Sequence, residues 1–536
     1  MAFRKRYPKK LKTSRQQKNE DAVSEEKKPS LDEDLADNLK KVQKSFGKSN
    51  DLVIRKWTIM TGKDSDPIGA AAIYMSGLVD EKLVNDFVSK SFEGRPFTYE
   101  HHKPAAEEVF QYLASQALSS EKLKIVKDWD SLIQDVLSGK TVLFVDGVDE
   151  VVTGDTKGGR MREISKPETQ LVIRGPKIAF TESIGANTAM IRRLIKSPNL
   201  QMETMKIGQV TQTEVALMYI KGIVNDKILE ELKHRLNTID TDAVLESGYV
   251  EQFIQDEPYS LFPTLYNTER PDSVAGNLLE GRVAIIVDGS PFVLVAPVTF
   301  IQFFQSPADY YQHFYIGTFL RLIRLLAYFL SLLTPALYIA LITFHQEMIP
   351  TTLLISLAAQ HEGVPFPAFI EAILMEITFE ILREAGLRMP RAVGQMISIV
   401  GALVVGEAAV QAGIISAAMV IVVSITGIAN FAIPAYNVTI ASRLLRFMMM
   451  LLAGTFGLYG IVLGLIGMTA HMTSLRSFGI PYLTPFAPIV VSDLKDTFIR
   501  RPLWALKTRP QLINHQNVER QGPEQRPAPP DKNTRR

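Results

Sequence analysis

The sequence contains no cysteine. Disulfide bonds and thiolate metal sites are therefore excluded. The beginning of the chain, AFRKRYPKKLKTSRQQK, also lacks the apolar stretch that a cleavable signal peptide requires. We therefore expect the large N-terminal part of the protein to stay in the cytoplasm.

Groups typical of catalysis or cofactor binding are scarce as well. The histidines at 101–102, 345, 361 and 471 have no partners at metal-ligand spacing, and no Ser/His/Asp grouping indicates a nucleophile. The Gly-rich stretch at 154–159 is not followed by the GK[ST] of a phosphate-binding loop. The net charge of +2 is too small to indicate nucleic-acid binding. We expect no enzymatic activity, no metal, no cofactor and no nucleic-acid partner.

Apolar residues are concentrated in one part of the chain. Residues 319–470 consist mainly of Leu, Ile, Val, Ala, Met and Gly, whereas the part before Pro307 has the mixed composition of a globular protein. This contrast predicts a mixed α/β cytoplasmic N-terminal domain of two subdomains, joined to an all-α, polytopic transmembrane domain. Basic residues cluster at both ends of the chain, which favours the cytoplasmic side of a membrane for both.

The domain boundaries that we predict follow the composition. Charge-rich segments with few large hydrophobic residues cannot bury enough surface to fold. The expected order is a disordered charged arm (1–50), two cytoplasmic subdomains (51–190 and 191–310), the transmembrane domain (311–492) and a basic cytoplasmic tail (493–536).

An internal echo in the sequence suggests the two subdomains. Gly139-Lys140, four residues and then Val145-Asp146-Gly147 match Gly281-Arg282, four residues and then Val287-Asp288-Gly289. In both places Asp-Gly predicts a hairpin turn, because glycine readily adopts the positive φ that such turns require. The alternative is that any strand-turn-strand segment looks like this.

Periodicity predicts the local structure of the N-terminal part. Apolar residues recur at helical spacing in 79–92, 107–120 and 214–236, whereas short β-branched runs predict buried strands at 141–145, 169–173 and 283–287.

Five segments of the apolar part are predicted to cross a membrane, and 350–360 is predicted to be a re-entrant piece. The five are Phe319–Phe344, Phe369–Leu382, Ala392–Gln411, Ile414–Ile433 and Phe447–Ala470. Arg321 and Arg324 place the start of the first segment inside the cell. Five crossings would leave the basic tail outside, against the same rule. Either 480–491 returns the chain or 350–360 crosses differently, so the number of spans stays open.

The helix predicted at 392–411 has two contrasting faces. One carries Met396, Val400, Leu403, Glu407 and Gln411, and the other carries the small residues Gly394, Ser398, Gly401 and Ala408. Small residues allow close packing of helices in a bilayer. The first face could then line a pore, with an apolar constriction and a ring of Glu407 carboxylates near the outer mouth. Alternatively, its apolar residues face lipid or a neighbouring helix.

Three further acids, Glu371, Glu376 and Glu380, lie in the predicted segment 369–382. A carboxylate at the centre of a bilayer costs about 2.5–3.5 kcal/mol, so these side chains must face protein or water. They could line a cation vestibule shared by several copies of the chain. They could equally belong to an ion-paired helix, with Glu380 bound to Arg383 and Glu384 to Arg388.

Long stretches of the chain resemble A subunits of the GerA family of spore germinant receptors. The resemblance lies in VPFPAFIEAILMEITFEILREAGLRMPRAVGQMISIVGALVVGEAAVQAGIISAAMVIVV (364–423), FAIPAYNVTIASRLLRF (431–447), LRSFGIPYLTPFAP (475–488), RGPKIAFTESIGANTAMIRR (174–193) and GRVAIIVDGSPFVLVAPVTFIQFFQSPADYY (281–311). It covers most of 51–510 and leaves out the terminal arms.

The resemblance implies a role in breaking spore dormancy. Such subunits are associated with a transporter-like B subunit and a lipoprotein C subunit in the inner membrane of the bacterial spore. They are thought to form a homo-oligomer, a pentameric ring that conducts monovalent cations across the lipid when a germinant binds. A non-conducting receptor scaffold is the alternative, and a secondary transporter is a weaker one, since no inverted repeat is visible.

Overall fold

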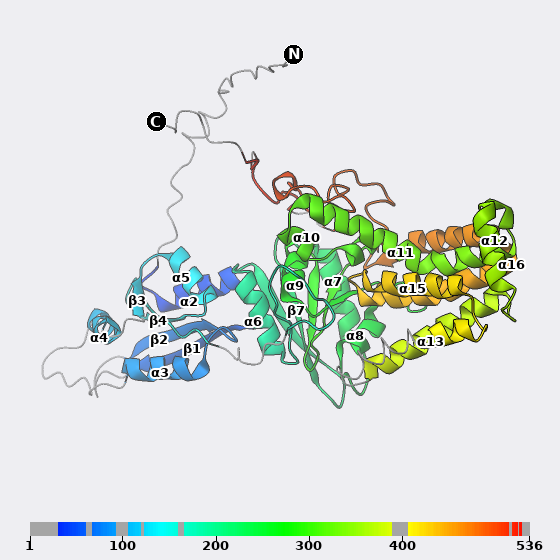
Figure 1. Ribbon diagram of the computed structural model, residues 1–536. Helices are drawn as coiled ribbons and strands as arrows, with labels where there is room; N and C mark the ends of the chain where they lie inside the picture. Colours follow the sequence, from blue (N-terminus) through cyan, green and yellow to red (C-terminus); the bar gives the residue numbers. More distant parts are fainter. Residues whose placement is uncertain are drawn as a thin grey trace, which may run out of the picture. The chain divides into compact units, whose positions relative to one another are not determined.

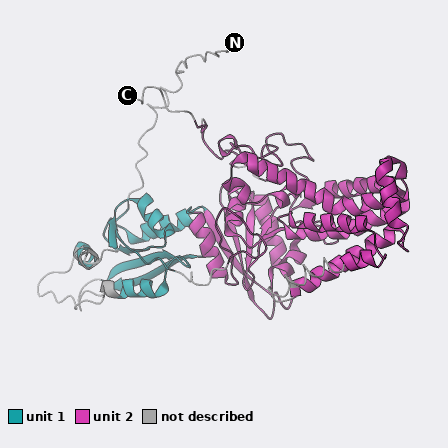
Figure 2. Ribbon diagram, viewed as in Figure 1, with its two compact units in different colours: residues 1–161, 196–199 teal, residues 162–195, 200–536 magenta. Residues whose placement is uncertain are grey.

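The computed structural model describes residues 31–59, 67–92, 106–118, 123–158, 166–388, 406–513, 517–523 and 525–527. The chain divides into two compact units, one of residues 1–161 and 196–199 and the other of residues 162–195 and 200–536 (Figure 2).

The first unit is built on one five-stranded antiparallel sheet with the strand order β1-β2-β4-β5-β3 (Figure 1). Its elements are α2 (Leu35–Phe46), β1 (Leu52–Ile59), β2 (Ile68–Met75), α3 (Glu81–Phe92), α4 (Ala106–Leu118), β3 (Leu123–Val126), α5 (Trp129–Leu137), β4 (Thr141–Val145) and β5 (Val151–Gly154).

The second unit begins with the same architecture. Its elements are α6 (Ile184–Leu194), β6 (Leu200–Ile207), β7 (Thr213–Ile220), α7 (Asp226–Asn237), α8 (Ser247–Ile254), β8 (Tyr266–Thr268), α9 (Pro271–Leu279), β9 (Val283–Val287) and β10 (Val293–Ala296). The sheet order is β6-β7-β9-β10-β8, so helices and strands follow one another as in the first unit, and the strands pair in the same order.

The sequence echo marks equivalent positions in these two sheets. The predicted hairpins are β4–β5 and β9–β10, and Gly147 and Gly289 adopt the expected positive φ of 83° and 85°. The aspartate before each glycine has a second role. The Oδ1 atoms of Asp146 and Asp288 each accept a hydrogen bond of 3.0 Å from the first amide of the leading helix, α2 or α6. Each Asp-Gly pair therefore fixes a helix as well as a turn.

Most predicted elements of the sheets are confirmed, and two are wrong. Residues 214–236 were expected to form one helix, but they form β7, a turn with Gly222 at φ 80°, and α7. The apolar run in β7 pairs with β6 and β9 at the centre of the sheet, and an apolar run of this length does not distinguish a buried strand from a helix.

The strand expected at 169–173 is also absent. Residues 166–180 are irregular, because the backbone amides of Glu168, Thr169 and Gln170 donate to the carboxylate of Glu269 at 2.6–3.1 Å instead of pairing with a strand.

Part of the expected N-terminal arm is a helix. Helix α2 begins after Asp34, whose side chain accepts hydrogen bonds from the amides of Ala36 and Asp37. Leu39, Val42 and Phe46 on one face of this helix are buried. The prediction of a disordered arm missed this helix, because it rested on the high charge content and not on the spacing of these few apolar residues. Residues 1–30 lie outside the described part of the chain.

A helical part follows the second sheet in the same unit. Its elements are η1 (Phe300–Phe304), α10 (Ala308–Tyr311), α11 (Phe314–Thr343), η2 (Gln346–Met348), α12 (Thr351–His361), α13 (Ala368–Arg388), α15 (Ala417–Phe431) and α16 (Tyr436–Ser474). Among the residues that the structure describes, two helices, α11 and α16, are long and apolar enough to cross a membrane, and α15 is a shorter apolar helix.

Helix α16 is broken at Gly457, which has φ 61° and ψ −141°. A Cβ atom on Gly460 would lie 2.1 Å from the carbonyl oxygen of Leu452, and one on Gly464 would lie 2.6 Å from the sulfur of Met449. Residues this far apart in sequence touch only if the chain folds back, so 436–456 and 458–474 form an antiparallel hairpin. The single span predicted at 447–470 is therefore wrong.

The chain then returns to the second sheet. Ser477 in β11 (Arg476–Ser477) donates to the carbonyl of Thr264 at 2.7 Å and accepts from the amide of Val298 at 3.0 Å. The chain after β12 (Ile480–Pro481) is the C-terminal segment. Its described residues are irregular apart from η3 (Leu503–Ala505), yet Ile513 is buried against the sheet. Part of the segment expected to be a basic tail (493–536) is therefore packed against the second sheet.

Candidate functional site

The acids of α13 are neutralised within one chain. Glu376 Oε2 lies 2.9 Å from Arg446 Nη2 of α16, and both side chains are almost completely buried. Glu380 pairs with Arg443 of α16 and lies 3.9 Å from Arg383, and its side chain is 40% exposed. These contacts match the ion-paired arrangement rather than a vestibule lined by all three acids.

Glu371 is stabilised in a different way. Its Oε1 accepts a hydrogen bond from the amide of Ser416, the residue that caps the N-terminus of α15, and His361 Nδ1 lies 3.7 Å from its Oε2. The N-terminus of a helix carries partial positive charge and favours a carboxylate. Burial of Glu371 and Glu376 therefore does not require other copies of the chain.

The predicted pore helix is described only at its end. Met396, Val400 and Leu403 lie outside the described residues, and so do Gly394, Ser398 and Gly401. Residues 406–411 are helical, and Glu407, Ala408 and Gln411 are all exposed. Glu407 Oε1 accepts from Gln411 Nε2 at 3.2 Å, and within the described part of the chain it has no cationic partner. The two faces of this helix remain predictions.

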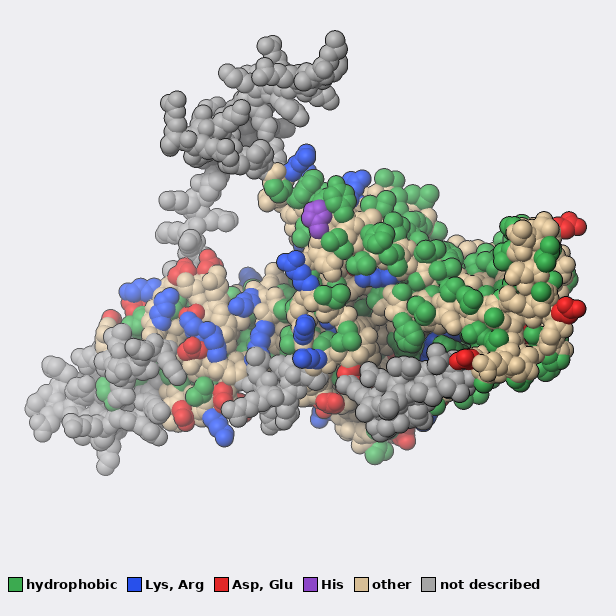
Figure 3. Space-filling view, viewed as in Figure 1, with side chains coloured by type: hydrophobic (Ala, Val, Ile, Leu, Met, Phe, Trp, Pro, Cys, Tyr) green, Lys and Arg blue, Asp and Glu red, His purple; other side chains and the backbone are tan. Residues whose placement is uncertain are grey.

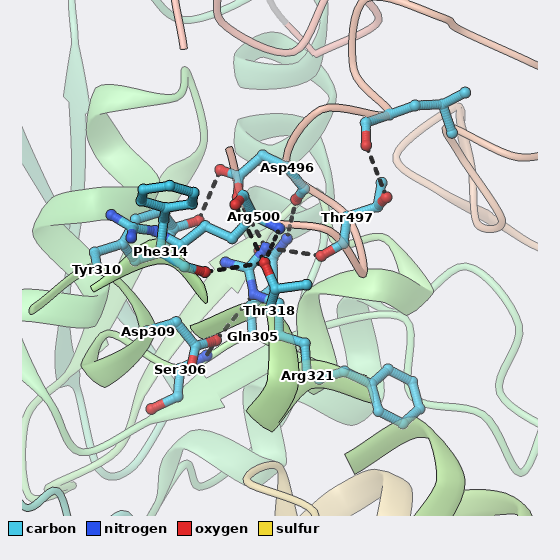
Figure 4. A network of polar contacts seen from close by, with 12 residues as sticks. Gln305, Ser306, Asp309, Tyr310, Phe314, Thr318, Arg321, Asp496, Thr497 and Arg500 are labelled. Atoms are coloured by element: carbon cyan, nitrogen blue, oxygen red, sulfur yellow. Dashed lines mark hydrogen bonds and ion pairs between the residues drawn. The ribbon is translucent and has the colours of Figure 1, made fainter. Parts of the chain in front are cut away.

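Sequence reasoning missed a cluster of charges at the start of α11 (Figure 4). Arg321 is 1% exposed, and its Nε lies 3.0 Å from Asp309 Oδ2. Its Nη1 lies 2.8 Å from Asp496 Oδ1. Arg324 also reaches Asp309, at 2.8 Å, and Tyr310 donates to Asp496 at 2.8 Å. The cluster fastens the C-terminal segment to the first long helix.

The charge state of this cluster follows from its surroundings. Burial raises the pKa of the Asp496 carboxyl, while the Arg321 guanidinium opposes that rise. Two arginines spaced three residues apart at the start of an apolar helix are a signal that sequence reasoning can use. The partner Asp496 lies 175 residues beyond Arg321, and no local pattern points to it.

A cavity of about 450 Å³ lies beside this cluster, between α9, η1, α10 and the C-terminal segment. Its charged lining includes Glu280, Arg282 and Arg520, and Gln305 and Tyr310 belong both to the cavity wall and to the contacts around Asp496. Nothing in the sequence pattern indicated this cavity, because its walls come from distant segments.

Many apolar side chains lie on the face of the helical part that Figure 3 shows. Large residues that are more than half exposed occur on α11, α15 and both arms of α16: Phe319, Leu326, Ile421, Ile428, Leu451, Phe456, Tyr459 and Ile466. Soluble monomers rarely expose a contiguous apolar surface of this extent.

Comparisons with known proteins agree with the resemblance found in the sequence. The family model described as Bacillus/Clostridium GerA spore germination protein matches residues 40–512. Spore germination protein KA of Bacillus subtilis (strain 168) is 50% identical over 92% of this chain and 89% of its own length. Spore germination protein GerLA of Bacillus cereus is 41% identical over 90% of this chain and 96% of its own.

One solved structure is also similar in sequence. It is the crystal structure of the N-terminal domain of the A subunit of the Bacillus megaterium spore germinant receptor GerK3. The two sequences are 42% identical. The match covers 51% of this chain and 99% of the crystallised domain, and its TM-score is 0.41. From the family match over residues 40–512 and the identity to full-length relatives, the chain belongs to the GerA family of spore germination proteins.

Proposed function

We propose that the protein is the A subunit of a nutrient germinant receptor and that several copies form a germinant-gated cation channel in the inner membrane of the spore. The membrane helices are the helical part of the second unit, and both α/β sheets lie in the cytoplasm. A transporter-like B subunit and a lipoprotein C subunit complete the receptor. Germinant binding opens the channel, and the loss of monovalent cations begins germination.

The hairpin in α16 supports this topology. It adds a crossing to the five expected from the sequence, so that the C-terminal segment lies on the side where α11 begins. Arg383, Arg388 and Arg443 lie at the ends of helices on that side, as the preference of basic residues for the cytoplasm requires. In the proposed topology the number of crossings is therefore six, and both basic ends of the chain lie on the cytoplasmic side.

The observation that carries the channel proposal is the exposure of Glu407. Glu371, Glu376 and Glu380 each have a partner in the same chain, whereas Glu407 is exposed without a cation among the described residues. A carboxylate in this position cannot face acyl chains at low cost. If several copies place Glu407 in a ring at the outer mouth of a pore, each carboxylate is hydrated and the ring attracts cations.

Cation flux through reconstituted protein tests the proposal. The protein reconstituted in liposomes with its B and C subunits should conduct K⁺ when a germinant is added. Both Val400→Ala and Glu407→Gln should change this conductance by more than about tenfold, because they alter the constriction and the acidic ring. Glu347→Gln is the matched control, since Glu347 is an exposed acid in η2 outside the proposed pore face.

A monomeric protein, or flux that Val400→Ala leaves unchanged, would contradict the channel. An oligomer that conducts no cations would instead favour the receptor scaffold.

A further inference from the structure

The cavity beside α9 has the size and position of a small-molecule site. Its volume of about 450 Å³ falls in the range of ligand pockets, and its walls combine α9 and α10 with Leu503, Leu506 and Arg520 of the C-terminal segment. Neither the pore proposal nor the ion pairs of α13 use any of these residues.

Two polar groups in its wall have unused hydrogen-bonding capacity. Arg282 and Gln302 are 5% and 4% exposed, and Arg282 Nε and Gln302 Oε1 are buried without a hydrogen-bond partner in the described part of the chain. The amide nitrogen of Gln302 donates to Asn277 Oδ1 at 2.8 Å, which leaves its oxygen free. Buried donors and acceptors in native proteins are almost always satisfied, so one donor and one acceptor here await a partner.

The basic residue at the position of Arg282 has a different partner in the first sheet. Lys140, the counterpart of Arg282 in the sequence echo, is neutralised by Asp135 at 2.7 Å. Asn277 occupies the position equivalent to Asp135, so Arg282 hydrogen-bonds to a neutral amide, and its nearest carboxylate, Glu280, is 3.7 Å away. Burial lowers the pKa of the Arg282 guanidinium, so its charge is destabilised where it stands. An anion is what this position lacks.

Arg520 adds a second positive charge to the cavity. It also lies 3.7 Å from Glu280, so one carboxylate is shared at long distance by two arginines. Guanidinium groups bind planar carboxylates through two parallel hydrogen bonds. The remaining wall offers hydroxyl and amide groups, among them Ser273, Gln302 and Gln305.

We propose that this cavity binds a small carboxylate whose carbon chain bears hydroxyl groups. The carboxylate lies between Arg282 and Arg520. A ligand hydroxyl donates to Gln302 Oε1 after the Gln302 side chain turns toward the cavity, because this oxygen has almost no exposed surface. Because Gln305 and Tyr310 contact both the cavity and Asp496, the ligand lies next to the cluster that fastens the C-terminal segment to α11.

Titration calorimetry on the full chain in detergent tests this with three six-carbon probes. Gluconate has the carboxylate and the hydroxyls, hexanoate has only the carboxylate, and sorbitol has only the hydroxyls. We expect gluconate to bind at least about tenfold more tightly than either of the others, a difference of about 1.4 kcal/mol. No detectable heat with gluconate, or equal affinity for sorbitol, would overturn the proposal.

Two pairs of variants locate the site. Gly276 lies in α9 on the cavity wall, and a Cβ atom there would meet nothing within 4 Å. Gly276→Leu should therefore fill the cavity without disturbing the fold and should abolish gluconate binding. Gly185→Leu is the control, because Gly185 is a helical glycine with equally open surroundings in α6, away from the cavity.

Arg282→Gln should also weaken gluconate binding at least about tenfold, whereas Arg476→Gln, at an exposed arginine outside the cavity, should not. The thermal midpoint of each variant shows whether it is folded. Unchanged affinity in a folded Gly276→Leu variant would refute the site even if Arg282→Gln proved unstable.

Discussion

At the scale of single residues, burial determines how much an ion pair contributes to the free energy of unfolding. The Glu376–Arg446 pair is almost fully buried, whereas Glu384 and Arg388 form a pair of similar length, 2.8 Å, that is more than half exposed. Removing one member of a buried pair leaves an uncompensated charge, while an exposed pair is already hydrated.

We therefore expect Glu376→Gln to destabilise the protein by about 3–5 kcal/mol and Glu384→Gln by less than about 1 kcal/mol. Thermal unfolding in detergent measures both. The double variant Glu376→Gln/Arg446→Met should regain much of the loss, because it removes the unpaired guanidinium as well. Equal effects of the two single variants would show that the Glu376 pair is hydrated.

A second residue-scale prediction concerns pH. Burial, reinforced by the nearby carboxylate of Glu246, raises the pKa of Glu251 in α8 to about 7. An acid with a raised pKa favours the folded state when protonated, so its contribution is complete below the ordinary carboxyl pKa and is lost as the pH rises through about 7.

The thermal midpoint should accordingly fall between pH 5 and pH 8, and Glu251→Gln should remove that part of the fall and raise the midpoint at about pH 8. Thermal unfolding of the Glu251→Gln variant and of the unchanged protein, measured over the same pH range, tests this. Parallel curves for the two proteins would rule out Glu251 as the group responsible.

At the scale of elements, the α16 hairpin depends on glycine at the contact between its arms. A side chain at Gly460 would overlap the backbone of Leu452, whereas Gly467 in the same arm has open space around it. Gly460→Ala should lower the thermal midpoint, because the arms must separate to admit the methyl group. Gly467→Ala should leave it unchanged or raise it slightly, since alanine favours helix. Similar midpoints for both variants would mean that the arms do not touch at Gly460.

The sequence predicted elements wherever a local pattern was sufficient. Continuous apolar runs bounded by turns identified β4 and β9, and the Asp-Gly pairs identified both hairpins. The hairpin in α16 escaped, because two apolar arms joined by one glycine have the same composition as one long span. In β7 the apolar run fitted either a strand or a helix, and only its neighbours in the sheet decided.

The candidate sites were harder to predict, for a physical reason. The acids of α13 were found because a carboxylate in an apolar segment is conspicuous, but their partners Arg443 and Arg446 lie on another helix. The cavity and the Arg321 cluster are assembled from segments that meet only in the folded chain. Spacing along the sequence carries no record of such contacts.

At the scale of the whole molecule, the proposed topology places both sheets and the C-terminal segment on one side of the membrane and η2 on the other. The absence of cysteine makes this measurable without background labelling. Asn237, Gln346 and Gln511 are exposed positions in α7, η2 and the C-terminal segment.

In intact cells, a membrane-impermeant maleimide should label Gln346→Cys but not Asn237→Cys or Gln511→Cys. The latter two should react only after permeabilisation, which also serves as their control for accessibility. Labelling of Gln511→Cys from outside would invert the C-terminal segment and contradict an even number of crossings.

The fastening of Arg321 also has a consequence for how the chain is made. Asp309 leaves the ribosome before Arg321, but Asp496 follows 175 residues later. At typical synthesis rates of about 5–20 residues per second, roughly 10–35 s pass before the second carboxylate exists. During that interval Arg321 in the nascent helix α11 can pair with Asp309 but not with Asp496. Arg321 can therefore form all of its ion pairs only when translation is nearly complete.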